Sequence, residues 1–324
     1  MLDPSVLDID APAVALDIET TLREQVLETL KRRGVVVGVS GGVDSAVVAT
    51  LCARALGPER VLALLMPERD SSVESFTLGR ELVEQLGVVS VTENLGPALT
   101  AIGCYARQDD AIRQVFSDFG PGWKFKLTLP SILEGERLNV FGLVLESPHG
   151  EVRKARLPVA AYLQLVAATN FKQRLRKTVE YYHADRLNHA VAGTPNRLEY
   201  DQGFFVKQGD GAADCKPIAH LYKTQVYALA RYLGVPEAIL SRPPTTDTYP
   251  MSQSQEEFYF ALPYDKMDLC LWAVNHDVPA TDVASTLGLD EQQVQRVFND
   301  IKAKRRTTQY LHRSPLLVER VPEV

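Results

Sequence analysis

The sequence VVVGVSGGVDSAVVATLCARAL, from Val35 to Leu56, joins a strand pattern to a helix pattern through a glycine-rich turn. Val35 to Val39 is rich in β-branched residues, which is typical of a strand buried on both faces of a parallel sheet. Apolar residues resume at helical spacing from Ala46 to Leu56. A strand, a turn and a helix in that order bring backbone N–H groups and the positive end of a helix to one point, which favours an anion site.

The turn SGGVDS carries residue types that suit a phosphate and a metal ion. Gly41 and Gly42 lack Cβ atoms and let the chain approach a phosphate closely, while Ser40 and Ser45 add hydroxyl donors. Asp44 would repel an anion unless a cation lay between them. We therefore assign Asp44 to Mg²⁺, which shares hard oxygen ligands with phosphates. The alternative is an ordinary tight turn between strand and helix.

This turn is not a Walker A loop, because the spacing and the GK[ST] ending are missing. It resembles the pyrophosphate-binding loop of the ATP pyrophosphatase group, whose members adenylate a substrate oxygen and release pyrophosphate. The resemblance implies a class of chemistry, and the substrate has to be inferred from the rest of the chain.

The composition is that of an ordinary globular protein, with 324 residues of which 45% are hydrophobic and 23% charged. A net charge of −6 and a pI of about 5.6 argue against a nucleic acid as the main partner. The four cysteines lie far apart, without metal-binding spacing, and indicate reduced thiols. We find no signal segment and no apolar run of membrane-spanning length, so we expect a cytoplasmic protein that does not bind membranes.

Strand and helix patterns alternate in the N-terminal part of the chain. A helix pattern over Ala11–Arg33 precedes the opening strand, and the strand patterns Val61–Met66 and Val88–Thr92 flank a helix pattern over Ser72–Leu86. This alternation predicts an α/β fold with a doubly wound parallel sheet flanked by helices. Ligands of such sheets bind at the carboxyl ends of the strands, so the residues after the first two strands should face one crevice.

Residues 105–157 interrupt this alternation. Trp123–Leu129 alternates polar and apolar residues, as does part of Glu151–Leu157, which predicts a small inserted antiparallel β element. We favour a surface decoration, because surface insertions are well tolerated, and the alternative is a lid or a partner-docking surface. Residues 255–324 show helix patterns and a basic tail. Since no linker or repeat is visible, we expect a single domain over residues 1–324.

The second half of the chain adds candidate residues to the same crevice. A long helix pattern begins at Val159 and carries a basic cluster that includes Arg174, and a solvated face explains most of that cluster. The strand pattern His189–Ala192 ends in GTPNRLE, so Thr194 lies at the carboxyl end of a strand. Glu199 follows and would complete a Mg²⁺ site with Asp44.

The segment FFVKQGDGAAD combines flexible glycines with Lys207, Asp210 and Asp214. Such loops often bind ligands, and solvated turn residues are the alternative. Lys223 opens the next helix pattern, where the helix dipole disfavours a cation, and a bound phosphate would relieve that conflict. The loop RPPTTDTYP comes later, and we expect its Thr245 to lie over a ligand.

The motifs follow one another in a family-like order: SGGVDS, NFKQRLR, GTPNRLE, FFVKQGDGAAD, Lys223 and PPTTD. Together they resemble the NAD⁺ synthetase family, from roughly Val26 to Val278. SGGVDS alone is shared with GMP synthetases, tRNA-thiolating and lysidine enzymes and argininosuccinate synthetases, whereas FFVKQGDGAAD is far more specific. The resemblance implies a ligase that uses ATP to turn the nicotinate carboxylate of deamido-NAD⁺ into an acyl adenylate, releasing pyrophosphate. Ammonia then attacks, and AMP leaves.

The resemblance also implies binding residues, position by position. Asp44 and Glu199 match the metal ligands, and no residue matches a covalent nucleophile. The positions that match ATP contacts are Gly38, Val39, Ser40, Gly41, Gly42, Val43, Asp44, Ser45, Thr194, Lys223 and Thr245. The positions that match deamido-NAD⁺ contacts are Arg174, Lys207, Asp214 and, in a loosely aligned tail, Lys304.

The resemblance implies a homodimer with deamido-NAD⁺ bound near the subunit interface. Glutamine-dependent members carry an amidase domain before the synthetase domain, for which this chain has no room, and no cysteine follows Met1. We therefore expect ammonia to arrive free or from a separate glutaminase subunit. Two other hypotheses stay open. One is a tRNA-thiolating enzyme, which the acidic pI and the lack of paired cysteines disfavour, and the other is a nucleotide-sensing protein that kept the fold.

Overall fold

The computed structural model describes residues 2–129, 133, 141–244, 249–251, 253–260 and 262–322. Its centre is a four-stranded parallel sheet with the strand order β3-β2-β1-β7. The strands are β1 (Val35–Gly38), β2 (Val61–Leu65), β3 (Val89–Thr92) and β7 (Ala190–Ala192). Val36 of β1 pairs with Leu62 on one side and with Val191 on the other, so β1 lies inside the sheet. The predicted α/β fold with a parallel sheet is confirmed.

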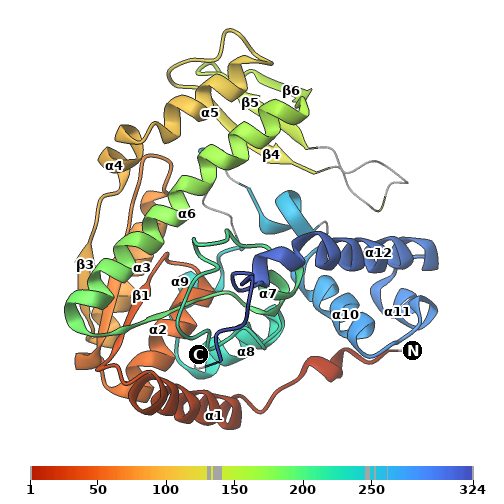
Figure 1. Ribbon diagram of the computed structural model, residues 1–324. Coiled ribbons are helices and arrows are strands. Elements are labelled where there is room, and N and C mark those ends of the chain that lie inside the picture. Colours follow the sequence, from red (N-terminus) through yellow and green to blue (C-terminus); the bar gives the residue numbers. More distant parts are fainter. Residues whose placement is uncertain are drawn as a thin grey trace.

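Helices cover both faces of this sheet (Figure 1). Successive side chains of a strand point to opposite faces, so Val35 and Val37 pack against α2 (Val43–Leu56), whereas Val36 packs on the face covered by α6 (Val159–Leu187). This is the doubly wound arrangement. The other helices of this half of the chain are α1 (Ala11–Arg23), α3 (Val73–Leu86), α4 (Gly96–Ala101), α5 (Cys104–Arg113), α7 (Arg197–Gln202), α8 (Lys223–Tyr232) and α9 (Glu237–Leu240).

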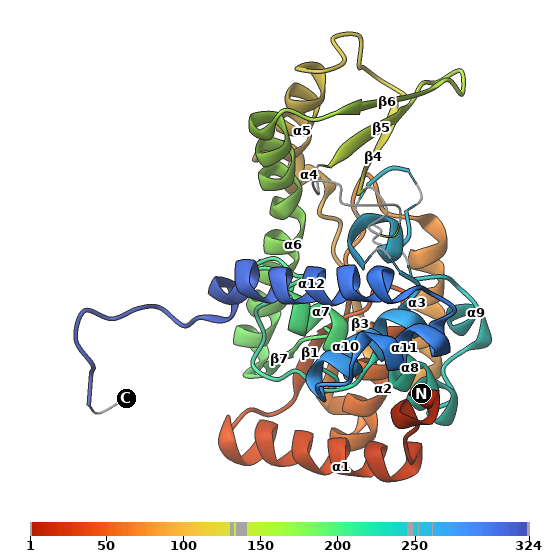
Figure 2. The same ribbon diagram turned by 90° about the vertical axis from the view of Figure 1, so that its right-hand side faces the viewer.

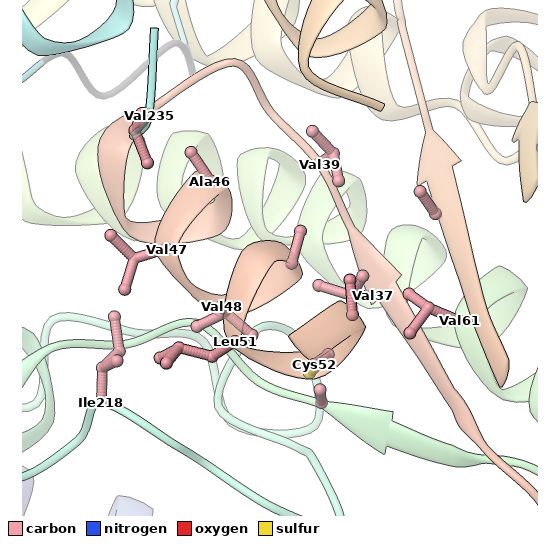
Figure 3. Packing of buried hydrophobic residues seen from close by; sticks show 14 of the residues in the cluster. Val37, Val39, Ala46, Val47, Val48, Leu51, Cys52, Val61, Ile218 and Val235 are labelled. Atoms are coloured by element: carbon pink, nitrogen blue, oxygen red, sulfur yellow. The ribbon is translucent and has the colours of Figure 1, made fainter. Parts of the chain in front are cut away.

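Helix α2 is buried along almost its whole length because it packs against the sheet, α1 and α8. Figure 3 shows Val48 and Leu51 of α2 in the cluster that also contains Val37 and Ile218. Burial of one such side chain stabilises the fold by roughly 1.5–3 kcal/mol. The packing fixes the start of α2, and with it the SGGVDS turn, at the carboxyl end of β1. The helix predicted over Ala11–Arg33 is shorter than expected, because α1 ends at Arg23 and gives way to a π-helical segment.

The insertion contains a separate three-stranded sheet with the order β4-β5-β6, as predicted. Its antiparallel strands are β4 (Lys124–Thr128), β5 (Gly142–Glu146) and β6 (Val152–Arg156). The first residues of the predicted insertion instead form α5, which packs along α6. Helix α6 therefore reaches from the inserted sheet down to the parallel sheet (Figure 1).

The C-terminal part is helical, as predicted, with α10 (Tyr264–Asn275), α11 (Ala280–Leu287) and α12 (Glu291–Thr308) around their own hydrophobic cluster. The N-terminus joins this cluster, since Leu2 N–H donates to the carbonyl oxygen of Asp282 at 3.2 Å. The chain after α12 extends away from the body (Figure 2). No helix in the described part of the chain is long and apolar enough to cross a membrane. The single-domain organisation over residues 1–324 stays a prediction.

Candidate active site

The SGGVDS turn curls tightly at the carboxyl end of β1. Gly41 has a φ of 78°, and a Cβ atom there would lie 2.2 Å from the carbonyl oxygen of Ser75 on α3, so only glycine fits. The hydroxyl oxygens of Ser40 and Ser45 lie 3.1 Å apart, and Ser45 Oγ accepts from the N–H of Ser40 at 3.2 Å. These contacts hold the turn at the N-terminus of α2, where backbone N–H groups and the helix dipole favour an anion.

The carboxylate of Asp44, in the first turn of α2, is bound by two side chains. Lys223 Nζ forms an ion pair with Asp44 Oδ2, and Asn196 Nδ2 donates to Asp44 Oδ1 at 3.2 Å. The Lys223 side chain is 2% exposed. Burial disfavours its charged form, but the carboxylates of Asp44 and Glu199 outweigh burial and raise the pKa of Lys223. The buried ammonium therefore stays charged.

A second carboxylate explains why a lysine is tolerated at the start of α8. Asp268 of α10 accepts from the backbone N–H groups of Lys223 at 3.2 Å and Thr224 at 2.7 Å, which neutralises the positive end of the helix. Burial raises the pKa of Asp268 to about 7. The expected conflict between Lys223 and the helix dipole is thus resolved by Asp268 and Asp44, and the argument that it requires a bound phosphate does not hold.

Glu199 lies in the first turn of α7, close to this ion pair. Its carboxylate accepts from the N–H of Asn196 at 3.1 Å and from Gln255 Nε2 at 3.0 Å. Burial, and next the negative charge of Asp44, raise the pKa of Glu199 to about 8. When Asp44 and Glu199 are both ionised, their negative charge exceeds the positive charge of Lys223. An additional cation would therefore stabilise the ionised form of Glu199.

This pair of carboxylates fits Mg²⁺ held jointly with a nucleotide. Within the described residues, no group of three or more His, Cys, Asp or Glu side chains is placed to hold a metal by itself. Mg²⁺ is commonly bound by one or two carboxylates and completes its shell with water and phosphate oxygens. Asp44 and Glu199 beside an anion-binding turn meet that requirement, and the raised pKa of Glu199 supports it.

A cleft of about 540 Å³ lies at the carboxyl ends of β1, β2 and β7, where the fold class predicted one. Helix α6 runs along one side of it, and segments far apart in the sequence meet there. The predicted site residues that line it are Gly38, Val39, Ser40, Gly42, Val43, Asp44, Ser45, Arg174, Thr194, Glu199, Lys207 and Lys223.

Comparison with known proteins identifies the family. A family model described as NAD synthase matches residues 14–117 and 146–310 of the chain. The chain belongs to the NAD synthase family. The NH(3)-dependent NAD(+) synthetase of Mesorhizobium japonicum is 61% identical over 98% of this chain and 100% of its own length, and that of Thermotoga neapolitana is 37% identical over 86% and 90%. The solved NH3-dependent NAD synthetase of Campylobacter jejuni, in complex with the nitrate ion, has a TM-score of 0.62 at 24% identity over 96% of this chain and 100% of that one.

The family assignment confirms the resemblance drawn from the motifs. The Campylobacter structure, at its low identity, supports the fold alone. Residues 118–145, which the NAD synthase model leaves unmatched, lie within the predicted insertion and include β4 and most of β5.

Two predicted substrate contacts of this NAD synthase family member do not line the cleft. Asp214 is exposed, and its Oδ2 accepts from the N–H of Val191 at 2.7 Å at the edge of the parallel sheet. Lys304 lies on α12, where its Nζ donates to the carbonyl oxygen of Tyr259 at 2.6 Å and pairs with Asp300 at 2.7 Å. A role in substrate binding stays a prediction for both residues.

Of the other predicted substrate contacts, Lys207 contacts the C-terminal segment and Arg174 contacts Lys207. Lys207 Nζ donates to the carbonyl oxygens of Tyr310 at 2.7 Å and Arg313 at 3.2 Å, and Arg174 Nε donates to the carbonyl oxygen of Lys207 at 3.3 Å. Thr245 lies outside the described residues, so its predicted ATP contact stays a prediction. Gly41 is not part of the cleft lining, and the position of its absent Cβ faces α3.

Sequence reasoning missed Asn196 and Gln255, which hold the two carboxylates. Asn196 and Glu199 form a capping box at the start of α7. The pattern Asn-x-x-Glu is a known sign of a helix N-terminus, and it could have identified Asn196. Gln255 lies 56 residues beyond Glu199, and no local pattern connects the two.

Sequence reasoning also missed a buried ion pair in α6 that lines the cleft. Lys177 Nζ lies 2.5 Å from Glu180 Oε2, and their side chains are 7% and 8% exposed. A Cβ atom on Gly38 would lie 3.0 Å from Glu180 Oε1, so the glycine leaves room for this carboxylate. The expectation of a solvated basic face fails for Lys172 and Lys177, which are both buried.

Proposed function

We propose that this chain is an ammonia-dependent NAD⁺ synthetase, a ligase that forms a carbon–nitrogen bond. It uses ATP to convert the nicotinate carboxylate of deamido-NAD⁺ to an acyl adenylate, and ammonia then displaces AMP to give NAD⁺. The observation that carries the proposal is the cluster of Asp44, Lys223 and Glu199 beside the SGGVDS turn. The 61% identity to an NH(3)-dependent NAD(+) synthetase supports it.

The first step needs positive charge where pyrophosphate leaves. An oxygen of the nicotinate carboxylate attacks the α-phosphorus of ATP, and the bond from that phosphorus to the bridging oxygen breaks. The backbone N–H groups at the start of α2 hold the phosphates, and Lys223 neutralises the charge that develops on pyrophosphate. Mg²⁺ held by Asp44 and Glu199 would supply further charge neutralisation at the phosphate oxygens.

The second step needs no covalent nucleophile on the protein. The nitrogen of ammonia attacks the carbonyl carbon of the acyl adenylate, the bond from that carbon to the oxygen of AMP breaks, and the nitrogen loses one proton. Water would hydrolyse the same intermediate, so the adenylate is best formed inside an enclosed cleft. The buried faces of α2, α6 and α8 around the cleft serve that purpose.

The proposal also covers the oligomeric state, the nitrogen donor and the cellular location of the enzyme. We propose a homodimer, which light scattering on the purified chain would test, and free ammonia as the donor unless a separate glutaminase subunit delivers it. A cytoplasmic location agrees with the four cysteines, which are buried free thiols.

A steady-state assay with the pure chain tests the reaction. With deamido-NAD⁺, ATP, Mg²⁺ and ammonium chloride we expect NAD⁺, AMP and pyrophosphate, and no NAD⁺ when glutamine replaces ammonium. Asp44→Ala should lower kcat by at least about a hundredfold, because it removes a metal ligand and leaves Lys223 unpaired. The exposed Asp265→Ala is the matched control and should keep wild-type turnover.

Other outcomes of this assay point elsewhere. ADP as the product would contradict adenylation, and turnover with glutamine would contradict direct use of ammonia. ATP binding without any turnover would favour the nucleotide-sensing hypothesis, and tight binding of tRNA would favour a tRNA-thiolating enzyme.

A further inference from the structure

One aromatic side chain from the insertion and two from other segments line the cleft together. Phe141 precedes β5, Tyr162 lies in the first turn of α6, and Phe258 comes from the segment 253–260. All three line the cleft, are half-buried, and pack on the hydrophobic core of the insertion. The rings of Phe141 and Tyr162 stack 4.6 Å apart at 17°, and the ring of Phe258 lies 6.1 Å from that of Phe141. We call these three residues the aromatic wall. Because the insertion reaches the cleft, it is more than a surface decoration.

Strand β4 contacts the segment 253–260, whose Gln255 in turn contacts Glu199. Lys126 of β4 pairs with Glu257 at 2.8 Å, and the N–H of Leu129 donates to the carbonyl oxygen of Glu257 at 3.3 Å. Gln255, on the same segment, donates to Glu199. Direct contacts thus connect the inserted sheet to the candidate metal ligand, so the aromatic wall has a defined place relative to it.

The aromatic wall lies far from the SGGVDS turn, where the phosphates of a nucleotide are expected to bind. One face of α6 lines the cleft with Tyr162, Val166, Gln173 and Lys177. The helix rises 1.5 Å per residue, so Tyr162 lies roughly 22 Å along α6 from Lys177. Lys177 pairs with Glu180, which lies beside Gly38 at the end of β1. That span is on the scale of an extended dinucleotide.

We infer that the aromatic wall binds the adenine ring of a nucleotide substrate, an inference that rests on the proposed function. The nicotinate carboxylate has to reach the α-phosphate of ATP near the SGGVDS turn, so the nicotinate ring belongs at that end. The three wall residues carry no charge, and a purine offers a flat face that stacks on aromatic rings. ATP also carries adenine, but only a ribose separates its adenine from the α-phosphate, so we assign the wall to the adenine of deamido-NAD⁺.

Phe141→Leu and Tyr162→Leu test the inference, because leucine keeps apolar volume and removes the flat ring. Calorimetric titration should show about a tenfold higher Kd for deamido-NAD⁺, the size expected for one lost base stack, and an unchanged Kd for ATP. A higher Kd for ATP alone would overturn the assignment to the dinucleotide. A higher Kd for deamido-NAD⁺, with unchanged binding of nicotinate mononucleotide, which has no adenine, assigns the wall to the dinucleotide.

Trp123→Leu is the matched control, since Trp123 belongs to the insertion and contacts Phe119 but does not line the cleft. It should leave both Kd values unchanged. Thermal melts establish that each variant is folded, and Phe258→Leu, on a different segment, replaces any variant that is not. Unchanged Kd values for both nucleotides in folded wall variants would overturn the inference, and so would an equal loss in Trp123→Leu. Because the readout is binding, a failure of the inference can be distinguished from a failure of the wild-type chain to amidate deamido-NAD⁺.

Discussion

At the scale of single residues, Glu199 has an electrostatic conflict. Its carboxyl is buried beside Asp44, which raises its pKa to about 8, whereas in an unfolded chain it ionises near 4.5. The folded state therefore binds the proton more tightly than the unfolded state. The protonated form of Glu199 contributes to the stability of the fold. This contribution is complete below about pH 4.5 and is lost as the pH rises towards about 8. Because ionised Glu199 lowers the stability of the fold at neutral pH, its position indicates a role in the reaction.

Glu199→Gln should therefore stabilise the fold at neutral pH while it impairs the reaction. The amide keeps the size of the side chain and removes the charge that burial disfavours. We expect no gain near pH 5 and a gain on the order of 2 kcal/mol at pH 7.5, measured by urea denaturation. In the same variant kcat should fall strongly, because a candidate metal ligand is lost.

The exposed Glu84→Gln on α3 is the control for this experiment and should change stability at neither pH. If Glu199→Gln lowered stability equally at both pH values, its hydrogen bonds with Asn196 and Gln255 would outweigh the charge effect, and the argument from the raised pKa would fail.

At the scale of elements, the position of Lys223 depends on the cap of α8. Asp268 on α10 binds the first two N–H groups of this helix, so Asp268→Ala removes both acceptors. We expect a loss of about 1–3 kcal/mol in stability and a higher KM for ATP, because the start of α8 carries Lys223 to Asp44. Asp268→Asn keeps one acceptor and removes the charge that burial disfavours, so it should lose less stability than alanine.

Asp265→Asn, at an exposed position on the same helix, should behave as the wild type in both measurements. A lower stability of Asp268→Ala with an unchanged KM for ATP would show that the cap supports the fold without positioning Lys223.

A buried charge cluster holds the loop after β2 against α6. Lys172 of α6 is 1% exposed and pairs with Glu68 at 3.0 Å and with Asp70 at 2.6 Å. Pro67 and Ser71 of the same loop line the cleft. Helix α6 thus positions this part of the cleft through Lys172, although none of the three charged residues lines the cleft.

Lys172→Met should destabilise the fold by about 3–5 kcal/mol in urea denaturation, because it leaves Glu68 buried without a cation and Asp70 with Arg69 alone. The double variant Lys172→Met with Glu68→Gln should regain much of that loss, since it also removes the carboxylate left without a cation. Lys154→Met on the exposed strand β6 serves as the control. Wild-type stability of Lys172→Met would contradict this account of the loop.

At the scale of the whole molecule, the sequence could predict what depends on local patterns. The β-branched run before SGGVDS, the alternation of strands and helices, and the polar–apolar alternation at Trp123–Leu129 each specify an element from its own residues. The parallel topology then brings Asp44, Thr194 and Glu199 to one edge, because the carboxyl ends of parallel strands share it.

The remaining features depend on contacts that no local pattern records. Asn196 meets Asp44 across 152 residues, and Lys223 meets it across 179. Lys177 and Glu180 have the same spacing as an exposed helical ion pair, so only the fold shows that they are buried. The contact of the insertion with the cleft likewise depends on how β4 packs against the segment around Glu257.

Because Lys223 and Asp44 are paired with each other, we expect both to change partners when a nucleotide binds. Lys223 already neutralises the Asp44 carboxylate, so a metal ion bound to Asp44 would compete with Lys223 for that negative charge. A free phosphate would draw Lys223 away and leave Asp44 without a cation, and a free metal ion would leave Lys223 without an anion. A ligand that brings both charges together satisfies both residues at once. We therefore expect this site to bind a metal-bound nucleotide in preference to either of its components.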